Sequence, residues 1–172
     1  SPATFSMDKL LWFNKYYLDQ MNTEELIQKI NLSHIDNSEY SKMVIDAVRD
    51  RCETLNDFST QTDYFFNEPE VYDQELIKKH CSSETSGYLN KLKSSLVDEH
   101  NWKQAAVKEV IDKIALDLEV GFGKIGLPLR LALTASTNSP SIDLVCEILG
   151  REETLKRLNS FLLFLNDQEK DL

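Results

Sequence analysis

Cysteine, glycine and proline are all scarce in this chain of 172 residues, which has three cysteines, five glycines and four prolines. The cysteines are odd in number and show no CxxC spacing, which argues against a disulfide framework and favours a reduced, cytoplasmic protein. No run of about 18 apolar residues occurs, so we expect no segment that spans a membrane. The features of a secretory signal are also missing from the polar N-terminal residues.

Motifs of catalysis and cofactor binding are also scarce. The sequence has no P-loop and no GxSxG, and its GxGxxG spacing, GFGKIG at residues 121–126, follows a helical pattern rather than a strand. The histidines His34, His80 and His100 lie far apart, and adjacent residues such as His80 and Cys81 point apart on a helix. No nucleophile stands in a recognisable relation to a base. We therefore expect no catalytic, metal or cofactor site, and a free-standing enzyme with an unrecognised site is kept only as a third alternative.

Positive charge is in short supply, because 29 acidic residues oppose 19 basic ones and leave a formal net charge of −10. Broad, non-specific binding of nucleic acid needs a basic face, so this composition speaks against that class of function. The excess is uneven, since residues 1–120 carry nine of the ten net negative charges. A local and specific contact with a polyanion therefore remains open for residues 121–172.

Helical periodicity is what the chain contains in abundance. Apolar residues recur every three to four positions in most segments, and no segment shows a sustained period of two. Start and stop signals agree with this pattern: Asn22 opens a capping box, Ser38 begins a helix and Gly150 ends one. Asn101 is expected to cap the longest helix. The sequence predicts an all-α fold, with Pro69 as the boundary between two helical subdomains.

The stretch GFGKIGLPLRLALTASTNSP, residues 121–140, holds three glycines and two prolines. Gly121 suits the left-handed cap that ends a helix, and Pro128 suits the first position of a short, buried helix. That helix is expected to run from Pro128 to Thr134. Ser139 and Pro140 are expected to begin the next helix as its cap and first residue.

Arg130 lies inside this apolar run, and local signals allow two interpretations. Beside two helix N-termini, its guanidinium would suit an anion or a nucleobase. Alternatively, Arg130 pairs with a carboxylate and the prolines only mark the ends of helices. Local signals alone favour the second interpretation.

Three segments, taken in order, carry a recognisable set of motifs. SPATFSMDKLLWFNKYYL follows the pattern P-A-x-F-[DS]-x-x-K-L-x-W-x-N-x-x-Y, and RCETLNDF follows R-x-x-T-L-x-[DE]. The third, GKIGLPLRLALTASTNSPSIDLVCEILGREETLKRL, contains PLR-x-A-x-T, S/T-P and LG-[KR]-E-x-x-x-x-R-[LI]. Trp102, which opens a helix, also fits. Together these segments resemble the C-terminal part of bacterial glutamyl-tRNA synthetases over essentially the whole chain.

The resemblance implies an all-α fold in two subdomains, the α-helix cage with which class I synthetases bind the anticodon. Residues 1–21 would end the stem-contact region, and residues 22–68 and 69–172 would form the two anticodon-binding subdomains. The full-length enzyme would join glutamate to its tRNA with ATP and Mg²⁺, in an N-terminal catalytic domain that this sequence does not contain. The resemblance therefore implies a cytoplasmic, monomeric, non-catalytic fragment whose partners are the anticodon loop of glutamate tRNA and that catalytic domain.

Six residues are matched to RNA contacts by the resemblance. Arg51 and Arg130 correspond to arginines that contact anticodon bases, and a planar fork of donors suits a base edge. Ser139, Pro140 and Ile142 correspond to a loop and helix start that pack against splayed bases. Lys124 corresponds to a phosphate contact. In the opening segment Trp12 and Tyr17 are expected to pack rather than to touch RNA, and the roles of Lys9 and Asn14 stay open.

Two features depart from the family pattern. Ala135 replaces the usual glycine after the threonine of PLR-x-A-x-T, so the following loop can have a different shape. The charge of −10 is high for a fragment that binds RNA, and binding is expected to weaken at higher salt. A second function therefore stays open: a helical protein-interaction module that uses the acidic faces of residues 1–120 to bind a basic partner or another synthetase.

Overall fold

The computed structural model describes residues 6–170 as an all-α protein, and it contains no strand within that range. The prediction of fold class is confirmed. Residues 1–5 and 171–172 lie outside the described part, and with them the first letters of the opening matched segment. Within residues 6–170 the protein has no helical stretch with the length and apolar character that a bilayer crossing needs.

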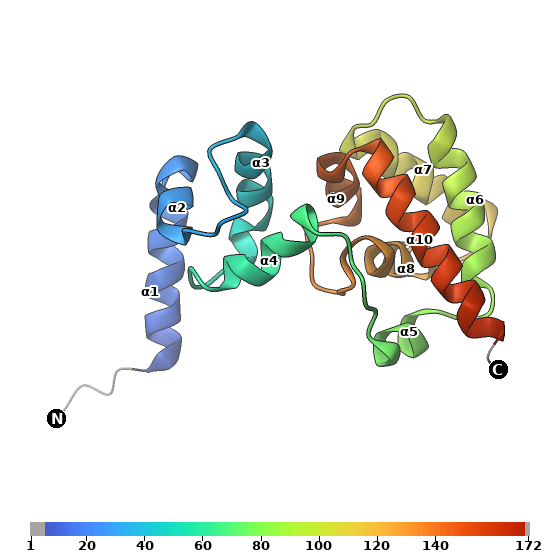
Figure 1. The fold of residues 1–172 in the computed structure, drawn as a ribbon, viewed down its shortest axis with the longest axis horizontal. Coiled ribbons are helices and arrows are strands. Elements are labelled where there is room, and N and C mark those ends of the chain that lie inside the picture. Colours follow the sequence, from blue (N-terminus) through green and yellow to red (C-terminus); the bar gives the residue numbers. More distant parts are fainter. Residues whose placement is uncertain (1–5, 171–172) are drawn as a thin grey trace. The chain divides into compact units, whose positions relative to one another are not determined.

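The chain divides into two compact units, and the division falls between Phe66 and Asn67. In the first unit the helices are α1 (Met7–Gln20), α2 (Thr23–Ile30), α3 (Glu39–Val48), the 3₁₀ turn η1 (Arg49–Arg51) and α4 (Asp57–Phe66) (Figure 1). In the second unit they are α5 (Gln74–His80), α6 (Thr85–Asp98), α7 (Gln104–Asp117), α8 (Gly123–Thr134), α9 (Ile142–Leu149) and α10 (Arg151–Lys170).

Helix α2 of the first unit begins as the sequence predicts. The side chain of Asn22 accepts a hydrogen bond from the Glu25 amide at 2.9 Å, and the Glu25 carboxylate accepts one from the Asn22 amide at 3.3 Å. At the start of α3 the Ser38 hydroxyl accepts a hydrogen bond from the Ser41 amide at 3.2 Å. Helices α2, α3 and α4 then enclose the core of the unit, in which Leu26, Ile45 and Phe58 are fully buried. Local caps thus fix where these helices start, and apolar burial holds them together.

Helix α8 is the central element of the second unit, because it contacts α5, α6, α7, α9 and α10. Figure 1 shows it lying between α9 and α10 in the middle of this unit. Its side chains are apolar almost all round, and Leu129, Leu131, Ala132 and Leu133 are all buried. A helix without a polar face is stable only when neighbours cover every side, and here five helices do so.

The start of α8 corrects the sequence prediction, because the helix begins at Gly123 and Pro128 lies in its interior. The amides of Lys124 and Gly126 bond to the carbonyls of Gly121 and Phe122, so the first turn is already formed before the proline. Pro128 lacks the N–H that would reach the Lys124 carbonyl, but burial of the following turns outweighs that loss. A Cβ on Gly126 would lie 2.5 Å from the Phe122 ring, so any larger residue here would require that ring to move.

Two predictions of helix ends and one of helix length are also wrong. The left-handed residue after α7 is Glu119, with φ 55°, and not Gly121. Helix α7 does not begin at Asn101, because Lys103 is its cap residue and the Glu147 carboxylate, from α9, accepts from the Gln104 amide. The longest helix is α10. A cap supplied by another helix leaves no signal in the local sequence, which is why the pattern placed this start too early.

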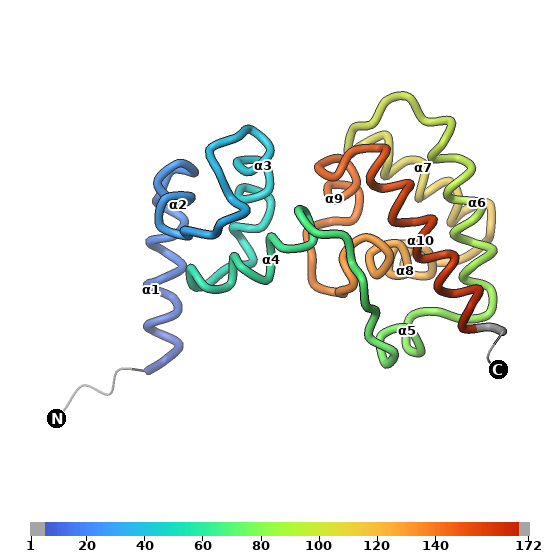
Figure 2. Tube along the Cα trace, in the orientation of Figure 1, coloured from blue at the N-terminus to red at the C-terminus, as the bar shows by residue number. Residues whose placement is uncertain are grey.

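Helix α9 begins later than the sequence predicts, at Ile142 with Ser141 as its cap residue. Ser139 and Pro140 belong instead to the loop of residues 135–141 between α8 and α9, which Figure 2 traces in orange. Both residues are buried and contact Arg130. The end of α9 agrees with prediction, since its last turn is closed by Gly150.

Gly150 provides a test of this helix end. Its backbone has φ 83° and ψ 164°, a conformation that is essentially restricted to glycine. We expect Gly150→Ala to lower the free energy of unfolding by about 1–3 kcal/mol, measured by urea denaturation. Gly87→Ala is the matched control, because a Cβ at this helical position meets nothing within 4 Å and should raise stability by about 0.5 kcal/mol. Equal effects of the two substitutions would contradict the assignment.

Candidate functional site

The six residues matched to RNA contacts fall into both units. Arg51 belongs to the first unit, at the end of η1. The other five belong to the second unit, where α8 and the loop that follows it carry Lys124, Arg130, Ser139, Pro140 and Ile142. The structure brings Arg130, Ser139 and Pro140 into direct contact with one another.

Arg51 is exposed and projects from a well-braced turn. The residue after it, Cys52, is fully buried and anchors η1 to the core. The next two amides, those of Glu53 and Thr54, both donate to the carboxylate of Asp57, at 2.9 and 2.8 Å. Because the backbone that follows Arg51 is fixed, this exposed residue has a defined position on the surface of its unit.

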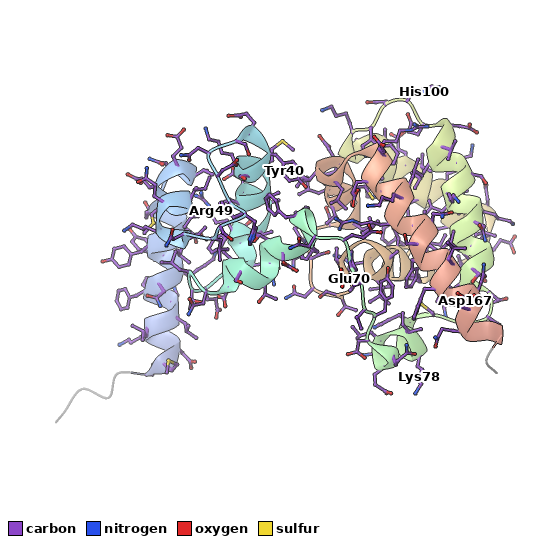
Figure 3. The ribbon with its side chains drawn as sticks, viewed as in Figure 1. Tyr40, Arg49, Glu70, Lys78, His100 and Asp167 are labelled. Atoms are coloured by element: carbon purple, nitrogen blue, oxygen red, sulfur yellow. The ribbon has the colours of Figure 1, made fainter. Side chains whose placement is uncertain are left out.

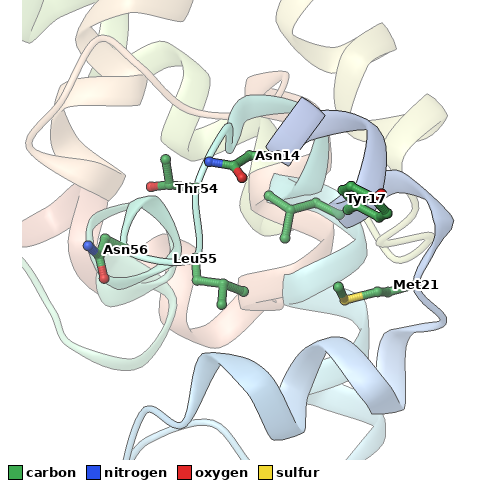
Figure 4. A pocket seen from close by; sticks show the side chains of 7 residues that line it. Asn14, Tyr17, Met21, Thr54, Leu55 and Asn56 are labelled. Atoms are coloured by element: carbon green, nitrogen blue, oxygen red, sulfur yellow. The ribbon is translucent and has the colours of Figure 1, made fainter. Parts of the chain in front are cut away.

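A cavity of about 370 Å³ opens on the same turn, between α1 and residues 54–56 (Figure 4). Its lining combines an aromatic ring, amides, a hydroxyl and aliphatic groups: Asn14, Tyr17, Leu18, Met21, Thr54, Leu55 and Asn56. A flat ring with polar edges, such as a nucleobase, fits this combination, because stacking and edge hydrogen bonds are available together. Sequence analysis missed Leu55 and Asn56, although both lie within the matched segment RCETLNDF.

Arg49, two residues before Arg51, has a different environment (Figure 3). Its Nη1 donates to the Met21 carbonyl at 2.8 Å, and its Nη2 donates to the Thr23 hydroxyl at 3.1 Å. The Asp46 carboxylate forms an ion pair with Nη2 at 3.5 Å. Arg49 therefore fixes the junction between α1 and α2. The sequence places both arginines at the end of one helix, and only the structure separates the internal brace from the exposed guanidinium.

Trp12 and Tyr17 do not pack inside the described part of the chain, contrary to expectation. Their exposed fractions are 62% and 61%. The ring of Trp12 stacks on Tyr16 with centroids 5.9 Å apart and an interplanar angle of 16°. Tyr17 lines the cavity described above. Helix α1 thus presents an aromatic face that the other described helices of its unit leave exposed.

Arg130 of α8 is half-buried and is bonded to the loop that follows its own helix. Its Nη1 donates to the Ser139 carbonyl at 2.9 Å, to the Pro140 carbonyl at 2.6 Å and to the Ser139 hydroxyl. These acceptors are backbone and hydroxyl oxygens. One nitrogen of Arg130 therefore sets the shape of the α8–α9 loop.

The loop buries the residues that were matched to base contacts and exposes others. Ser139 and Ile142 are each 1% exposed, and Pro140 is buried. The exposed positions of the same segment are Thr137, Asn138 and Ser141. Hydrogen bonds within the loop brace its tip, since the Asn138 amide donates to the Ser136 hydroxyl at 3.0 Å. Sequence analysis missed these exposed positions. In an irregular loop no regular sequence pattern shows which residues are buried and which are exposed.

Lys124 is exposed in the first turn of α8. It makes no ion pair with the side chains that the structure describes. It also lines a cavity together with residues of α5. Its position is thus compatible with contact to an anion.

The cysteines are unreactive in this fold. Burial raises the pKa of the Cys52 and Cys146 thiols to about 12, and that of Cys81 to about 11. Thiols with such pKa values stay protonated at neutral pH and are poor nucleophiles. Among the described residues no group of three histidine, cysteine, aspartate or glutamate side chains is placed to hold a metal ion.

The hydrogen bonds of Arg130 predict that the protein is less stable without this side chain. Arg130→Ala removes the donor that satisfies the Ser139 and Pro140 carbonyls, so we expect the free energy of unfolding to fall by about 1–3 kcal/mol. Urea denaturation followed at Trp102, in a Trp12→Phe background, reports on the second unit. Lys124→Ala on the same helix is the control and should change stability by no more than about 0.5 kcal/mol. Unchanged stability of Arg130→Ala would show that the loop does not depend on this guanidinium.

Comparisons with known proteins agree with the sequence motifs. A family model described as an anticodon binding domain matches residues 12–162. A glutamate tRNA ligase from Elizabethkingia meningosepticum CCUG26117 superposes with a TM-score of 0.81 at 29% identity, covering 92% of this chain. A glutamate-tRNA synthetase from Elizabethkingia anophelis gives a TM-score of 0.77 at 27% identity and the same coverage.

This chain spans about a third of both structures, since 32% of each matched chain is covered. The family match takes in most of both units, including the turn of Arg51 and the loop that follows α8. Fold, motifs and structural similarity therefore lead to one conclusion: the chain belongs to the anticodon binding domain family.

Proposed function

We propose that this chain recognises the anticodon loop of glutamate tRNA, as the C-terminal anticodon-binding region of a glutamyl-tRNA synthetase. The family match over residues 12–162 and the similarity to two glutamate ligases support this assignment. The observation that carries it is Arg51, an exposed guanidinium three residues before Thr54, which lines the cavity of amide, hydroxyl and aromatic groups. Ligation of glutamate with ATP and Mg²⁺ would belong to the catalytic part of the full-length enzyme.

The geometry suits a base that has left its stack. Single-stranded loops offer such bases, and proteins read them by stacking and by hydrogen bonds to their edges. In this chain the ring of Tyr17 can stack, while the side chains of Asn14 and Asn56 can exchange hydrogen bonds with a base edge. The Arg51 guanidinium supplies paired donors of the kind that read guanine or a base carbonyl. Arg51 is therefore our candidate for direct base reading.

In this proposal Arg130 contributes to RNA binding indirectly. Its Nη1 is committed to the Ser139 and Pro140 carbonyls, so its contribution is the shape of the loop that it holds. The exposed residues Thr137, Asn138 and Ser141 would then face the nucleotides. Ser139, Pro140 and Ile142 would support these contacts from beneath, because all three are buried. The matched segment thus remains an RNA contact, but different side chains of it touch RNA.

The acidic charge of the chain restricts how it binds. With a net charge of −10, long-range attraction to a polyanion is weak, and affinity must come from local contacts. The same proposal includes a monomer that works in the cytoplasm, where tRNA is charged. One stem-loop bound by one chain is the expected stoichiometry.

The test is binding of the 172-residue chain to a glutamate-tRNA anticodon stem-loop at low salt, measured by fluorescence anisotropy. Stem-loops with each anticodon base replaced in turn report on base reading. We expect Arg51→Ala to weaken binding by about 1–3 kcal/mol and to relax the preference at one base. Stability should change by no more than about 0.5 kcal/mol, because the side chain is exposed.

Lys29→Ala is the matched control, since Lys29 is an exposed cation of the same unit that lies outside the cavity. It should leave the base preference intact. Equal binding of all stem-loops by the wild-type chain would refute anticodon reading. If Arg51→Ala keeps the base preference of the wild-type chain, Arg51 does not read an anticodon base.

The aromatic face of α1 supports a second partner. Trp12, Phe13 and Tyr16 are all exposed, and the Trp12 ring contacts the other two rings. Contiguous apolar surface of this kind usually marks an interface with protein. Since the chain spans about a third of the two similar ligases, we propose that the catalytic part of the full-length enzyme covers this face.

Substitution of Trp12 tests this contact. We expect Trp12→Glu to leave the helix content of the isolated chain unchanged, because the ring is 62% exposed. In the full-length enzyme the same charge would be buried in the interface and should lower the melting temperature. A full-length enzyme with an unchanged melting temperature would contradict the proposed contact and would favour a separate protein partner.

A further inference from the structure

A second cavity, of about 360 Å³, lies in the second unit between the end of α5 and the start of α8. It is lined by Lys79, His80, Gly121, Gly123, Lys124 and Leu127. Three of these six residues carry basic side chains, and none of them is acidic. Lys79 and His80 come from the last turn of α5, and Lys124 comes from the first turn of α8. Neither the sequence motifs nor the proposed function assigns a role to α5.

The basic side chains of this cavity have no partner among the residues that the structure describes. Neither Lys79, His80 nor Lys124 forms an ion pair or a side-chain hydrogen bond there. By contrast, Lys78, the neighbour of Lys79, lies 3.3 Å from the Glu75 carboxylate. The pocket thus gathers three basic side chains from two helices with no acidic residue in its lining, although the chain has a net charge of −10, and this arrangement points to an external anion.

The backbone of the cavity leaves room for close approach. A Cβ on Gly121 would meet nothing within 4 Å, and one on Gly123 would meet only the Leu127 side chain at 3.8 Å. The amides of Lys124, Ile125 and Gly126 are already bonded to the carbonyls of Gly121 and Phe122. Attraction for an anion therefore comes from the side chains of Lys79, His80 and Lys124 rather than from free amides at the helix end.

We propose that this cavity, the α5–α8 pocket, binds a backbone phosphate of the RNA. The inference rests on the proposed function and deepens it by adding Lys79 and His80 to the RNA contacts. A phosphodiester is favoured over a nucleotide because three of the six lining residues are basic, no phenylalanine, tyrosine or tryptophan ring is present, and Leu127 is the one apolar side chain. Lysines act as point charges without a preferred geometry, so the contact would position the RNA without reading its sequence.

Salt dependence of binding tests the pocket. The wild-type chain is compared with the double variant Lys79→Gln, Lys124→Gln, with affinity for the stem-loop measured over a range of salt concentrations. The slope of log K against log salt should become shallower by about 0.7–0.9 for each phosphate that the variant no longer neutralises. Affinity should fall by the same factor for every anticodon sequence, because the phosphate carries no base identity.

The double variant Lys91→Gln, Lys113→Gln is the matched control. Both lysines are exposed in the same unit, have no described ion-pair partner and lie outside the pocket. The control removes the same charge, so it corrects for long-range effects and should keep the wild-type slope. Circular dichroism checks that all variants are folded.

The outcomes separate the two proposals. If the wild-type chain binds no stem-loop, the proposed function fails and the pocket loses its ligand with it. If the wild-type chain binds and both double variants share its slope, the pocket inference is overturned while the proposed function stands. The alternative ligand is a free phosphate ion. It is tested by titrating the chain with inorganic phosphate and following the amide chemical shifts of Gly121 and Gly123. Saturation at submillimolar phosphate would identify a site for a free anion and overturn the assignment to RNA.

Discussion

Burial of α8 is the constraint on which the second unit depends. The helix has no polar face, and covering Leu129, Leu131 and Leu133 contributes about 1.5–3 kcal/mol for each side chain. Its ends, however, carry carbonyls and amides that must also be satisfied in a crowded environment. Arg157 of α10, which is 2% exposed, donates to the Leu133 carbonyl at 2.8 Å. Arg130 holds the loop that leaves the helix. The shape of the candidate RNA surface at this loop is therefore a consequence of how a buried helix is ended.

The arginines of this chain illustrate how position decides role. Arg49, Arg130 and Arg157 each donate to backbone carbonyls and brace a junction between helices. Arg51 has its backbone fixed by neighbours while its side chain is exposed. A guanidinium that is braced internally contributes geometry, and one that is exposed on a rigid turn can contribute recognition. In an acidic chain this arrangement allows specific contacts with RNA without a general basic surface.

Sequence reasoning succeeded where the signal is local. The capping box at Asn22 and the glycine that ends α9 lie within a few residues of the features that they determine, and both are confirmed. It failed where the partner is distant in sequence, as with the start of α7, which depends on Glu147. Pro128 was misplaced because packing from five helices overrides its local preference. Family motifs pointed to Arg51, but they could not reveal that Ser139 is buried. They also could not reveal the α5–α8 pocket, which forms only when residues about 40 positions apart meet.

A structure of this chain bound to the glutamate-tRNA anticodon stem-loop would show which side chains touch the bases. We expect the Arg51 guanidinium to lie within hydrogen-bond distance of a base edge, with that base stacked against Tyr17. We also expect Arg130 to keep its bonds to the Ser139 and Pro140 carbonyls while nucleotides contact the exposed part of the loop. A complex in which the anticodon bases lie away from Arg51, or in which Arg130 releases the loop to grasp a base, would contradict the division of roles between the two arginines.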